Sequence, residues 1–130
     1  MFTLNRTGGT PVTFEGKLLA RGQSYHPDEK LDRGYDLEVY LTQEGRWVAR
    51  IGFQTRWKTE AATSRCLIAE SAPELAAALS SYNPLQDVVG YPKGAQFDGK
   101  QKHLTVTLRL KWTSLLGSVL VQIPQMATQA

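Results

Sequence analysis

Two stretches of alternating apolar and polar residues, joined by a short polar turn, constrain the fold of this chain more than any other feature. They span residues 35–41 and 47–57, and Gln43, Glu44 and Gly45 lie between them. Alternation with a period of two is typical of β-strands that bury one face. A glycine at the end of a three-residue loop fits the left-handed backbone conformation that such loops need. The pattern therefore predicts a β-hairpin.

The length of the loop also determines how the two strands of this hairpin pair. With three loop residues, Leu41 lies opposite Trp47. The following pairs on the same apolar face are Val39 with Ala49, Leu37 with Ile51, and Tyr35 with Phe53. A slip by one residue would bring polar side chains into this set, so the register is strongly specified. On the opposite, outer face the same register predicts two further pairs: Glu38 with Arg50, and Tyr40 with Val48.

The composition is that of one ordinary globular domain. The chain has 130 residues, of which 42% are hydrophobic and 21% charged. A single cysteine cannot form an intramolecular disulfide, which favours a reducing compartment. No apolar run reaches the length of a signal peptide or the ~20 residues of a membrane helix. We therefore expect a single cytoplasmic α+β domain over residues 1–130, without membrane contact, and with flexible ends near residues 1–10 and 124–130.

Strands are also predicted before and after the hairpin. Residues 12–25 read as a first strand whose apolar side chains share one face: Val12, Phe14, Leu18 and Ala20. Gly16 and Gly22 indicate a bulge or a close approach of another backbone along this strand. A short strand is expected again over residues 65–70. Together with the hairpin, these segments predict an antiparallel meander of about four strands.

A helix near residues 72–82 follows the last of these strands. Ser71 can cap its first turn, Pro73 is tolerated there, and Glu74 completes a capping box. Pro84 then ends the helix. We expect this helix and a C-terminal segment to pack on one face of the meander.

The C-terminal segment near residues 101–122 carries two competing patterns. One set of apolar residues alternates as in a strand: Leu104, Val106, Leu108, Leu110 and Trp112. A second set recurs at helical spacing: Leu104, Leu108, Trp112, Leu115, Val119 and Ile123. The threonines and Val106 favour a strand, whereas the length of the run without a strong breaker favours a helix. A helix is the preferred prediction, and a strand is the alternative.

Among the sequence features, only the distribution of basic side chains indicates a particular kind of partner. In the register above, four of them share the outer face of the hairpin: Arg46, Arg50, Arg56 and Lys58. Arg109 and Lys111 enrich the last third of the chain. With Tyr40, such a face could hold a phosphate backbone and stack a base. The net charge of only +3, and the ability of Glu38 to neutralise Arg50, make nucleic-acid binding the alternative function and not the preferred one.

No constellation of residues predicts an enzyme, a metal site or a cofactor. Cys66 could act as a nucleophile with His26 or His103 as its base. However, Cys66 alternates with apolar residues along its strand, which is typical of a buried and inert thiol. An acidic cluster precedes the hairpin without the spacing or central glycine of an EF-hand: Asp28, Glu29, Asp32 and Asp36. We expect no catalysis, no metal and no cofactor.

An apolar pair on the outer face indicates how the chain contacts a partner. Tyr40 and Val48 lie where a solvated sheet is normally polar, and Leu19 and Leu67 extend the pair. Contiguous exposed apolar surface often marks an interface, and two-fold pairing is its commonest form. The sequence therefore predicts a small non-enzymatic interaction or regulatory module, whose partner is another protein or a second copy of the chain.

Overall fold

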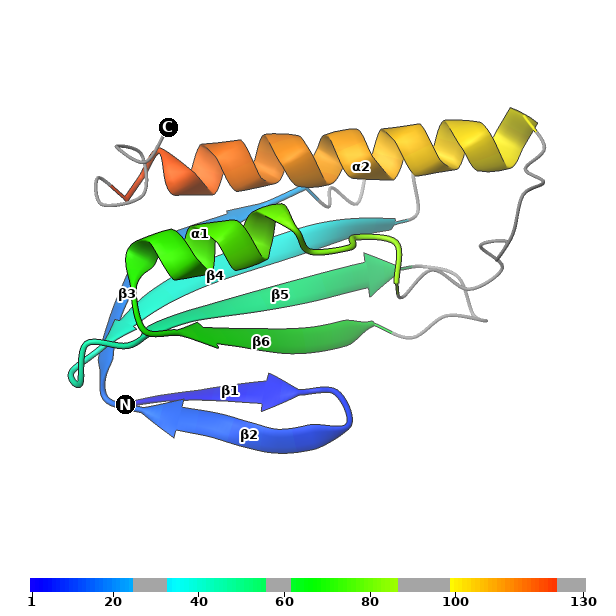
Figure 1. Cartoon of the computed structure of the whole chain (residues 1–130). Helices are drawn as coiled ribbons and strands as arrows, with labels where there is room; N and C mark the ends of the chain where they lie inside the picture. The colour runs from blue at the N-terminus through cyan, green and yellow to red at the C-terminus, as the bar shows by residue number, and fades with distance from the viewer. Residues whose placement is uncertain (25–32, 56–61, 87–98, 124–130) are drawn as a thin grey trace.

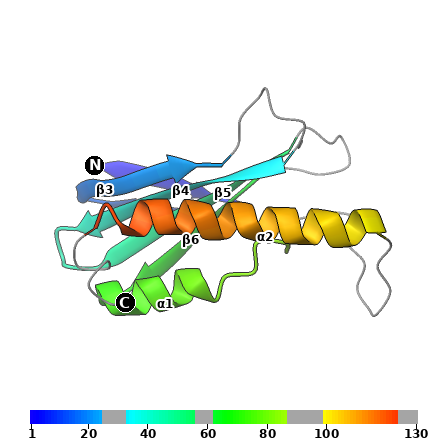
Figure 2. The same cartoon turned by 90° about the horizontal axis from the view of Figure 1, so that it is seen from above.

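The fold is an α+β arrangement in which two helices cover one face of an antiparallel sheet, as the sequence predicts (Figures 1 and 2). The computed structural model describes residues 1–24, 33–55, 62–86 and 99–123. The strands are β1 Phe2–Arg6, β2 Gly9–Phe14, β3 Gly16–Gln23, β4 Arg33–Thr42, β5 Trp47–Thr55 and β6 Thr63–Ala69. The helices are α1 Ala72–Ser80 and α2 Gly99–Leu120. Strands β3, β4, β5 and β6 form the sheet in sequence order, while β1 and β2 form a separate hairpin.

The register between β4 and β5 is the one that the loop length predicts. Leu41 pairs with Trp47, and the remaining pairs follow without a shift through Tyr35 and Phe53. Gly45 has a φ of 87°, and its N–H donates to the carbonyl of Thr42 at 3.0 Å. The three-residue loop therefore closes through the left-handed glycine, which an L residue would adopt only with strain.

The face of the sheet toward the helices carries one continuous apolar core. Its largest fully buried strand residues are Tyr35, Leu37, Ile51 and Phe53, and those of the helices are Leu75, Leu79, Leu108 and Val119. The Tyr35 hydroxyl donates to the carbonyl of Pro84 at 2.6 Å, which satisfies the one polar group at its buried end. Gly22 allows α2 to approach β3, because an added Cβ there would lie 3.0 Å from Leu115 and 3.2 Å from Val119.

Both helices confirm their sequence signals. The Ser71 hydroxyl caps α1 by accepting the N–H of Glu74 at 3.3 Å, and the Glu74 carboxylate accepts the N–H of Glu70 at 2.9 Å. In the C-terminal segment the helical spacing prevails over the alternating pattern. Val106 and Leu110, which only the strand pattern would bury, are 56% and 62% exposed on α2.

The N-terminal region differs from the sequence prediction. Residues 12–25 do not form one strand, since β2 ends at Phe14 and β3 begins at Gly16 in a different sheet. Gly16 is a point of close approach, because an added Cβ would lie 2.3 Å from the carbonyl oxygen of Leu41. The register shift within β3 falls between Leu18 and Ala20 and not at a glycine. Residues near 1–10, expected as a flexible end, contain β1 and the start of β2; residues 124–130 lie outside the described part of the chain.

Candidate functional site

The hairpin formed by β1 and β2 covers part of the outer face, the side of the sheet away from the helices (Figure 1). The ring of Tyr40 lies 4.8 Å from that of Phe2 and 5.4 Å from that of Phe14, measured between centroids. Tyr40 is 4% exposed and Val48 is 2% exposed. The prediction of an exposed apolar pair is therefore wrong, because another segment of the same chain buries it. The observation that motivated an interface at these two residues is removed with it.

The two leucines expected beside this pair lie on the other side of the sheet. Leu19 and Leu67 pack against the core under the helices. For Leu67 the reason is the register, which places it opposite Ala49 on the helix side. For Leu19 it is the register shift between Leu18 and Ala20, which changes the side to which this part of β3 points.

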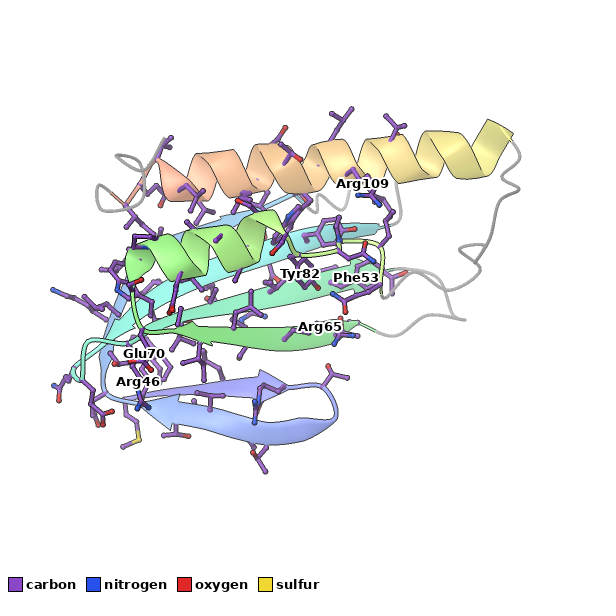
Figure 3. The ribbon with its side chains drawn as sticks, in the orientation of Figure 1. Arg46, Phe53, Arg65, Glu70, Tyr82 and Arg109 are labelled. Carbon is purple, nitrogen blue, oxygen red and sulfur yellow. The ribbon has the colours of Figure 1, made fainter. Side chains whose placement is uncertain are left out.

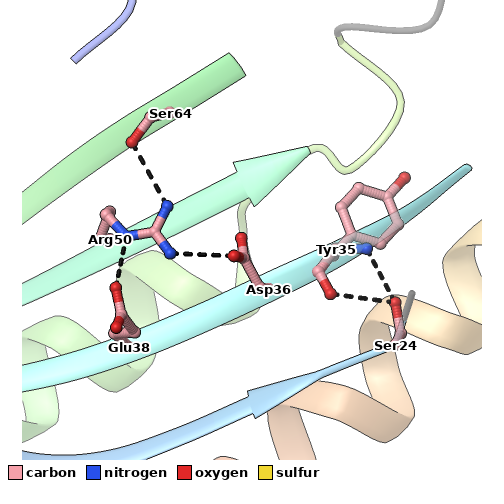
Figure 4. Close-up of polar contacts among 6 residues, drawn as sticks. All are labelled: Ser24, Tyr35, Asp36, Glu38, Arg50 and Ser64. Carbon is pink, nitrogen blue, oxygen red and sulfur yellow. Dashed lines mark hydrogen bonds and ion pairs between the residues drawn. The ribbon is translucent and has the colours of Figure 1, made fainter. Parts of the chain in front are cut away.

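Beside the hairpin, an arginine lies between two carboxylates on the outer face (Figure 4). The Arg50 guanidinium donates to Glu38 through Nε and to Asp36 through Nη2, the latter at 2.9 Å. Its Nη1 reaches the Ser64 hydroxyl at 3.5 Å. Burial alone would lower the pKa of Arg50, but the hydrogen bonds and negative charges of Glu38 and Asp36 raise it above its ordinary value. We call Asp36, Glu38, Arg50 and Ser64 the Arg50 cluster.

Gly52 of β5 leaves room for the Arg50 cluster because it has no side chain. A Cβ at Gly52 would lie 1.7 Å from Oδ1 of Asp36, so any larger residue there would displace this carboxylate. Oδ1 itself is buried and has no hydrogen-bond partner among the described residues. The hollow beside the cluster, of ≈ 440 Å³, is lined by Arg21, Gly22, Gln23, Asp36, Glu38 and Arg50. Its two arginines balance its two carboxylates, so the hollow presents no net charge to an ionic ligand.

The basic residues predicted to bind nucleic acid do not form one surface in the described part of the chain. Arg50 is held in the Arg50 cluster, with 19% of its side chain exposed, and Arg46 lies 3.5 Å from the carboxylate of Glu70. Arg109 and Lys111 lie on α2, on the opposite side of the sheet, as the position of Arg109 shows in Figure 3. Lys111 donates to the carbonyl of Ser24 at 3.3 Å. Arg56 and Lys58 lie outside the described residues.

A second hollow separates the β1–β2 hairpin from the turn between β4 and β5. It has a volume of ≈ 370 Å³ and is lined by Val12, Thr13, Phe14, Glu15, Thr42, Gln43, Glu44, Arg46, Val48 and Ile68. We call it the hairpin groove. Ile68 is 52% exposed at this groove, although it lies on the same face as the buried Val48 opposite it. Ile68 is thus an exposed apolar residue on the outer face, where the sequence prediction placed the pair of Tyr40 and Val48.

The sequence prediction does not identify the groove, because it treats Val12 and Phe14 of one wall as the start of a longer strand over residues 12–25. The signal was present in the sequence: Phe2 and Leu4 alternate on one side of Gly8, and Val12 and Phe14 alternate on the other. Gly8 adopts a positive φ of 74° at the second residue of the Thr7–Gly8 turn, a conformation that glycine adopts without strain. Pro11 argued against a strand, but it lies where the pairing of β1 with β2 is irregular.

The thiol of Cys66 lies on the outer face against the aromatic cluster, by which we mean Phe2, Phe14 and Tyr40 under the hairpin. Burial raises its pKa, although the charges of Arg6 and Arg50 act in the opposite direction. The thiol is therefore protonated at neutral pH. Of the histidines considered as its base, His26 lies outside the described residues, as do the acidic residues at positions 28, 29 and 32. Within the described ranges no three His, Cys, Asp or Glu side chains form a group that could hold a metal ion.

These features define a small α+β domain with an antiparallel meander, a helical layer on one face and an N-terminal hairpin on the other. In comparisons with known proteins, no protein family, curated protein or solved structure matches the chain significantly. A search of the described helices finds none that is both long and apolar enough to cross a membrane.

Proposed function

We propose that this chain is a small non-enzymatic interaction module and that another protein molecule contacts it at the hairpin groove. The observation that carries this proposal is the half-exposed side chain of Ile68 beside an apolar groove. Elsewhere the same face is polar at the Arg50 cluster, covered at Tyr40, and less exposed at Leu18, whose exposed fraction is 37%. Apolar surface that a fold leaves exposed next to a groove often marks an interface.

The groove combines an apolar floor with a charged rim. Phe14 and Val48 contribute to the floor, while Glu44 and Arg46 lie at the rim. In protein interfaces, buried apolar anchors supply most of the affinity, and rim charges restrict orientation and partner choice. A volume of ≈ 370 Å³ is near the lower end of the ~300–1,000 Å³ of ligand pockets, which suits side chains of a partner segment. A cytoplasmic location belongs to the proposal and is supported by the single cysteine.

The test is site-specific photo-crosslinking in cells. A benzophenone amino acid is placed at Ile68 in one variant and at Leu110 in a matched control, whose side chain is 62% exposed on α2. We expect a discrete protein product from position 68 and none from position 110. Equal, diffuse labelling from both positions would contradict the proposal, because it would show that the groove is no more a contact surface than the exposed helix.

A further inference from the structure

The edge strand β6 offers backbone hydrogen-bonding groups beside the hairpin groove. β6 lies at one end of the strand order, next to β5 only (Figure 1). The N–H of Ser64 donates to the Thr7 hydroxyl at 2.8 Å, and its carbonyl accepts the N–H of Thr7 at 2.8 Å, so the backbone of Ser64 points away from β5. Because this direction alternates along an antiparallel strand, the backbone groups of Cys66 and Ile68 also point away from β5. We call residues 66–68 the edge window; Ile68 also lines the groove.

The chain itself limits the edge window at both ends. Thr7 occupies the position beside Ser64, and the Glu74 carboxylate accepts the N–H of Glu70. Between these closures, no described residue forms a hydrogen bond with the outward N–H and carbonyl groups of the window. An open edge of this kind is a template for an extended strand of another chain, provided that this strand turns away before it reaches Thr7.

The rim of the hairpin groove carries a negative charge that the chain does not compensate. Glu15 is paired with the amino group of Met1 at 3.3 Å, and Glu70 is paired with Arg46 at 3.5 Å beside the groove (Figure 3). Glu44, on the exposed turn between β4 and β5, lines the groove and has no ionic partner among the described residues. A basic side chain is therefore the complement of this rim, although the chain as a whole has a net charge of +3.

We propose that the partner segment at the hairpin groove is an extended strand that pairs antiparallel with the edge window and carries an apolar residue two positions after a lysine or arginine. This inference rests on the proposed function and names the chemistry of its partner. The apolar residue lies opposite Ile68 and covers its half-exposed side chain. In an antiparallel strand, the residue two positions earlier lies on the same face and opposite Glu70, so its positive charge meets the acidic rim.

The antiparallel direction follows from the short length of the edge window. In an antiparallel pair, the residues opposite 66–68 use every open group, because each outward residue exchanges two hydrogen bonds with the residue opposite it. A parallel strand needs the residues opposite 65 and 69 as well to make the same bonds, and it therefore extends toward the position that Thr7 occupies. The antiparallel strand can leave the edge directly after the residue opposite Cys66.

The test is an NMR titration of the full chain with two peptides of identical composition. The first is acetyl-Gly-Arg-Thr-Val-Thr-Ser-Gly-amide, and the second has the five central residues in reverse order. We expect saturable shifts of the Cys66 and Ile68 amide resonances with the first peptide. The second should bind roughly two- to fivefold more weakly, because its arginine follows the valine and lies away from the rim. No saturable shift at these amides up to millimolar peptide, or equal affinity of both peptides, would overturn the inference.

Three variants separate the charge from the backbone contact. Glu44→Lys reverses the rim charge, so we expect it to prefer a peptide with glutamate in place of the arginine. Thr113→Lys adds a positive charge on the exposed face of α2 and is the control, which should bind as the wild type does. Ile68→Pro removes an outward N–H that takes no part in the ladder with β5, so the folded variant should lose binding of both peptides. A folded Ile68→Pro variant with wild-type affinity would contradict strand pairing.

The outcomes are separable from those of the proposed function. A discrete crosslink from position 68 in cells, together with no peptide binding, refutes strand pairing and leaves the interaction module in place. Peptide binding in the expected order, without a crosslink from position 68, supports the edge window as a strand-binding site and contradicts the proposed function.

Discussion

The two faces of the four-stranded sheet are built from the same strands but are buried in different ways. On the helix side, α1 and α2 complete one continuous apolar core. On the outer side, the β1–β2 hairpin covers a small aromatic cluster, and the Arg50 cluster occupies the surface beside it. One face is closed mainly by apolar packing, and the other is divided into a covered apolar part, an ionic part and an exposed edge. We therefore expect stability to reside mainly on the helix side, and we propose that the outer side contacts the partner.

The largest effect is expected from a truncation in the helix-side core. Trp47→Ala removes a side chain that is only 7% exposed, and we expect a loss of about 3–5 kcal/mol in the free energy of unfolding. Denaturant unfolding at equilibrium measures it. Ile68→Ala is the control on the outer face, where exposure limits the expected change to within about 0.5 kcal/mol. An unchanged midpoint for Trp47→Ala would contradict the comparison.

A smaller effect is expected from the aromatic cluster under the hairpin. Phe14 is only partly buried against Phe2 and Tyr40, so Phe14→Ala should cost about 1–3 kcal/mol. Because the sheet separates this cluster from the helix-side core, the double variant with Trp47→Ala should show additive losses to within about 0.5 kcal/mol. Coupling well above that value would mean that the two faces act as one core.

The helix-side face is predictable from the sequence because its signals are local. The three residues between β4 and β5, with Gly45 at the turn, are enough to place Leu41 opposite Trp47. The helical spacing that includes Leu108 and Val119 likewise identifies the buried side of α2. Each signal needs only neighbours within a strand, a hairpin or a helix.

The outer face is less predictable because its cover comes from a distant part of the chain. Val12, Phe14 and Ala20 all fit one alternating pattern that runs through Glu15. Periodicity alone therefore predicts one strand, whereas the structure has two strands, in different sheets, that meet at Glu15. The pairing of Glu38 with Arg50 follows from the hairpin register and is confirmed. The hairpin groove does not follow from it, since its position depends on how two separate sheets pack.

The Arg50 cluster should contribute less than the helix-side core and about as much as the aromatic cluster. Arg50→Met leaves Asp36 and Glu38 partly buried without a cation, and we expect a loss of about 1–3 kcal/mol. The triple variant Asp36→Asn, Glu38→Gln and Arg50→Met removes all the charges together and should recover part of that loss. Thermal or denaturant unfolding measures both. A single variant as stable as the wild type would show that the cluster is only a solvated surface contact.

The free energy of unfolding should depend on pH through Tyr40, in the covered part of the outer face. Burial, followed by the negative charge of Glu38, raises the pKa of Tyr40 to about 12. The folded state therefore favours the neutral phenol. Its contribution to stability is complete below the unfolded pKa of about 10 and is lost as the pH rises through about 12. Unfolding curves across this window should fall more steeply for the wild type than for Tyr40→Phe, and parallel curves would contradict the burial of this hydroxyl.

The smallest effect is expected in nucleic-acid binding, the alternative function predicted from the sequence. Four phosphate contacts would give a slope of log K against log salt of roughly −3 to −4. The pairing of Arg50 with Glu38 and of Arg46 with Glu70 reduces the positive charge that the outer face can offer, and Arg109 and Lys111 lie behind the sheet. We therefore expect a much flatter slope in fluorescence anisotropy with single- and double-stranded oligonucleotides.

The variant that sharpens this measurement is Glu38→Gln with Glu70→Gln, which frees Arg50 and Arg46 from charged partners without changing the basic residues. If these ion pairs limit binding, the variant should bind oligonucleotides more tightly than the wild type at ~50 mM salt, because electrostatic contacts are least screened there. Its affinity should also depend more steeply on the salt concentration. A wild-type slope of about −3 to −4 that Arg56→Ala and Lys58→Ala flatten would instead support a basic track on the outer face. The division of that face into a neutralised part and a proposed contact surface at the hairpin groove would then have to be abandoned.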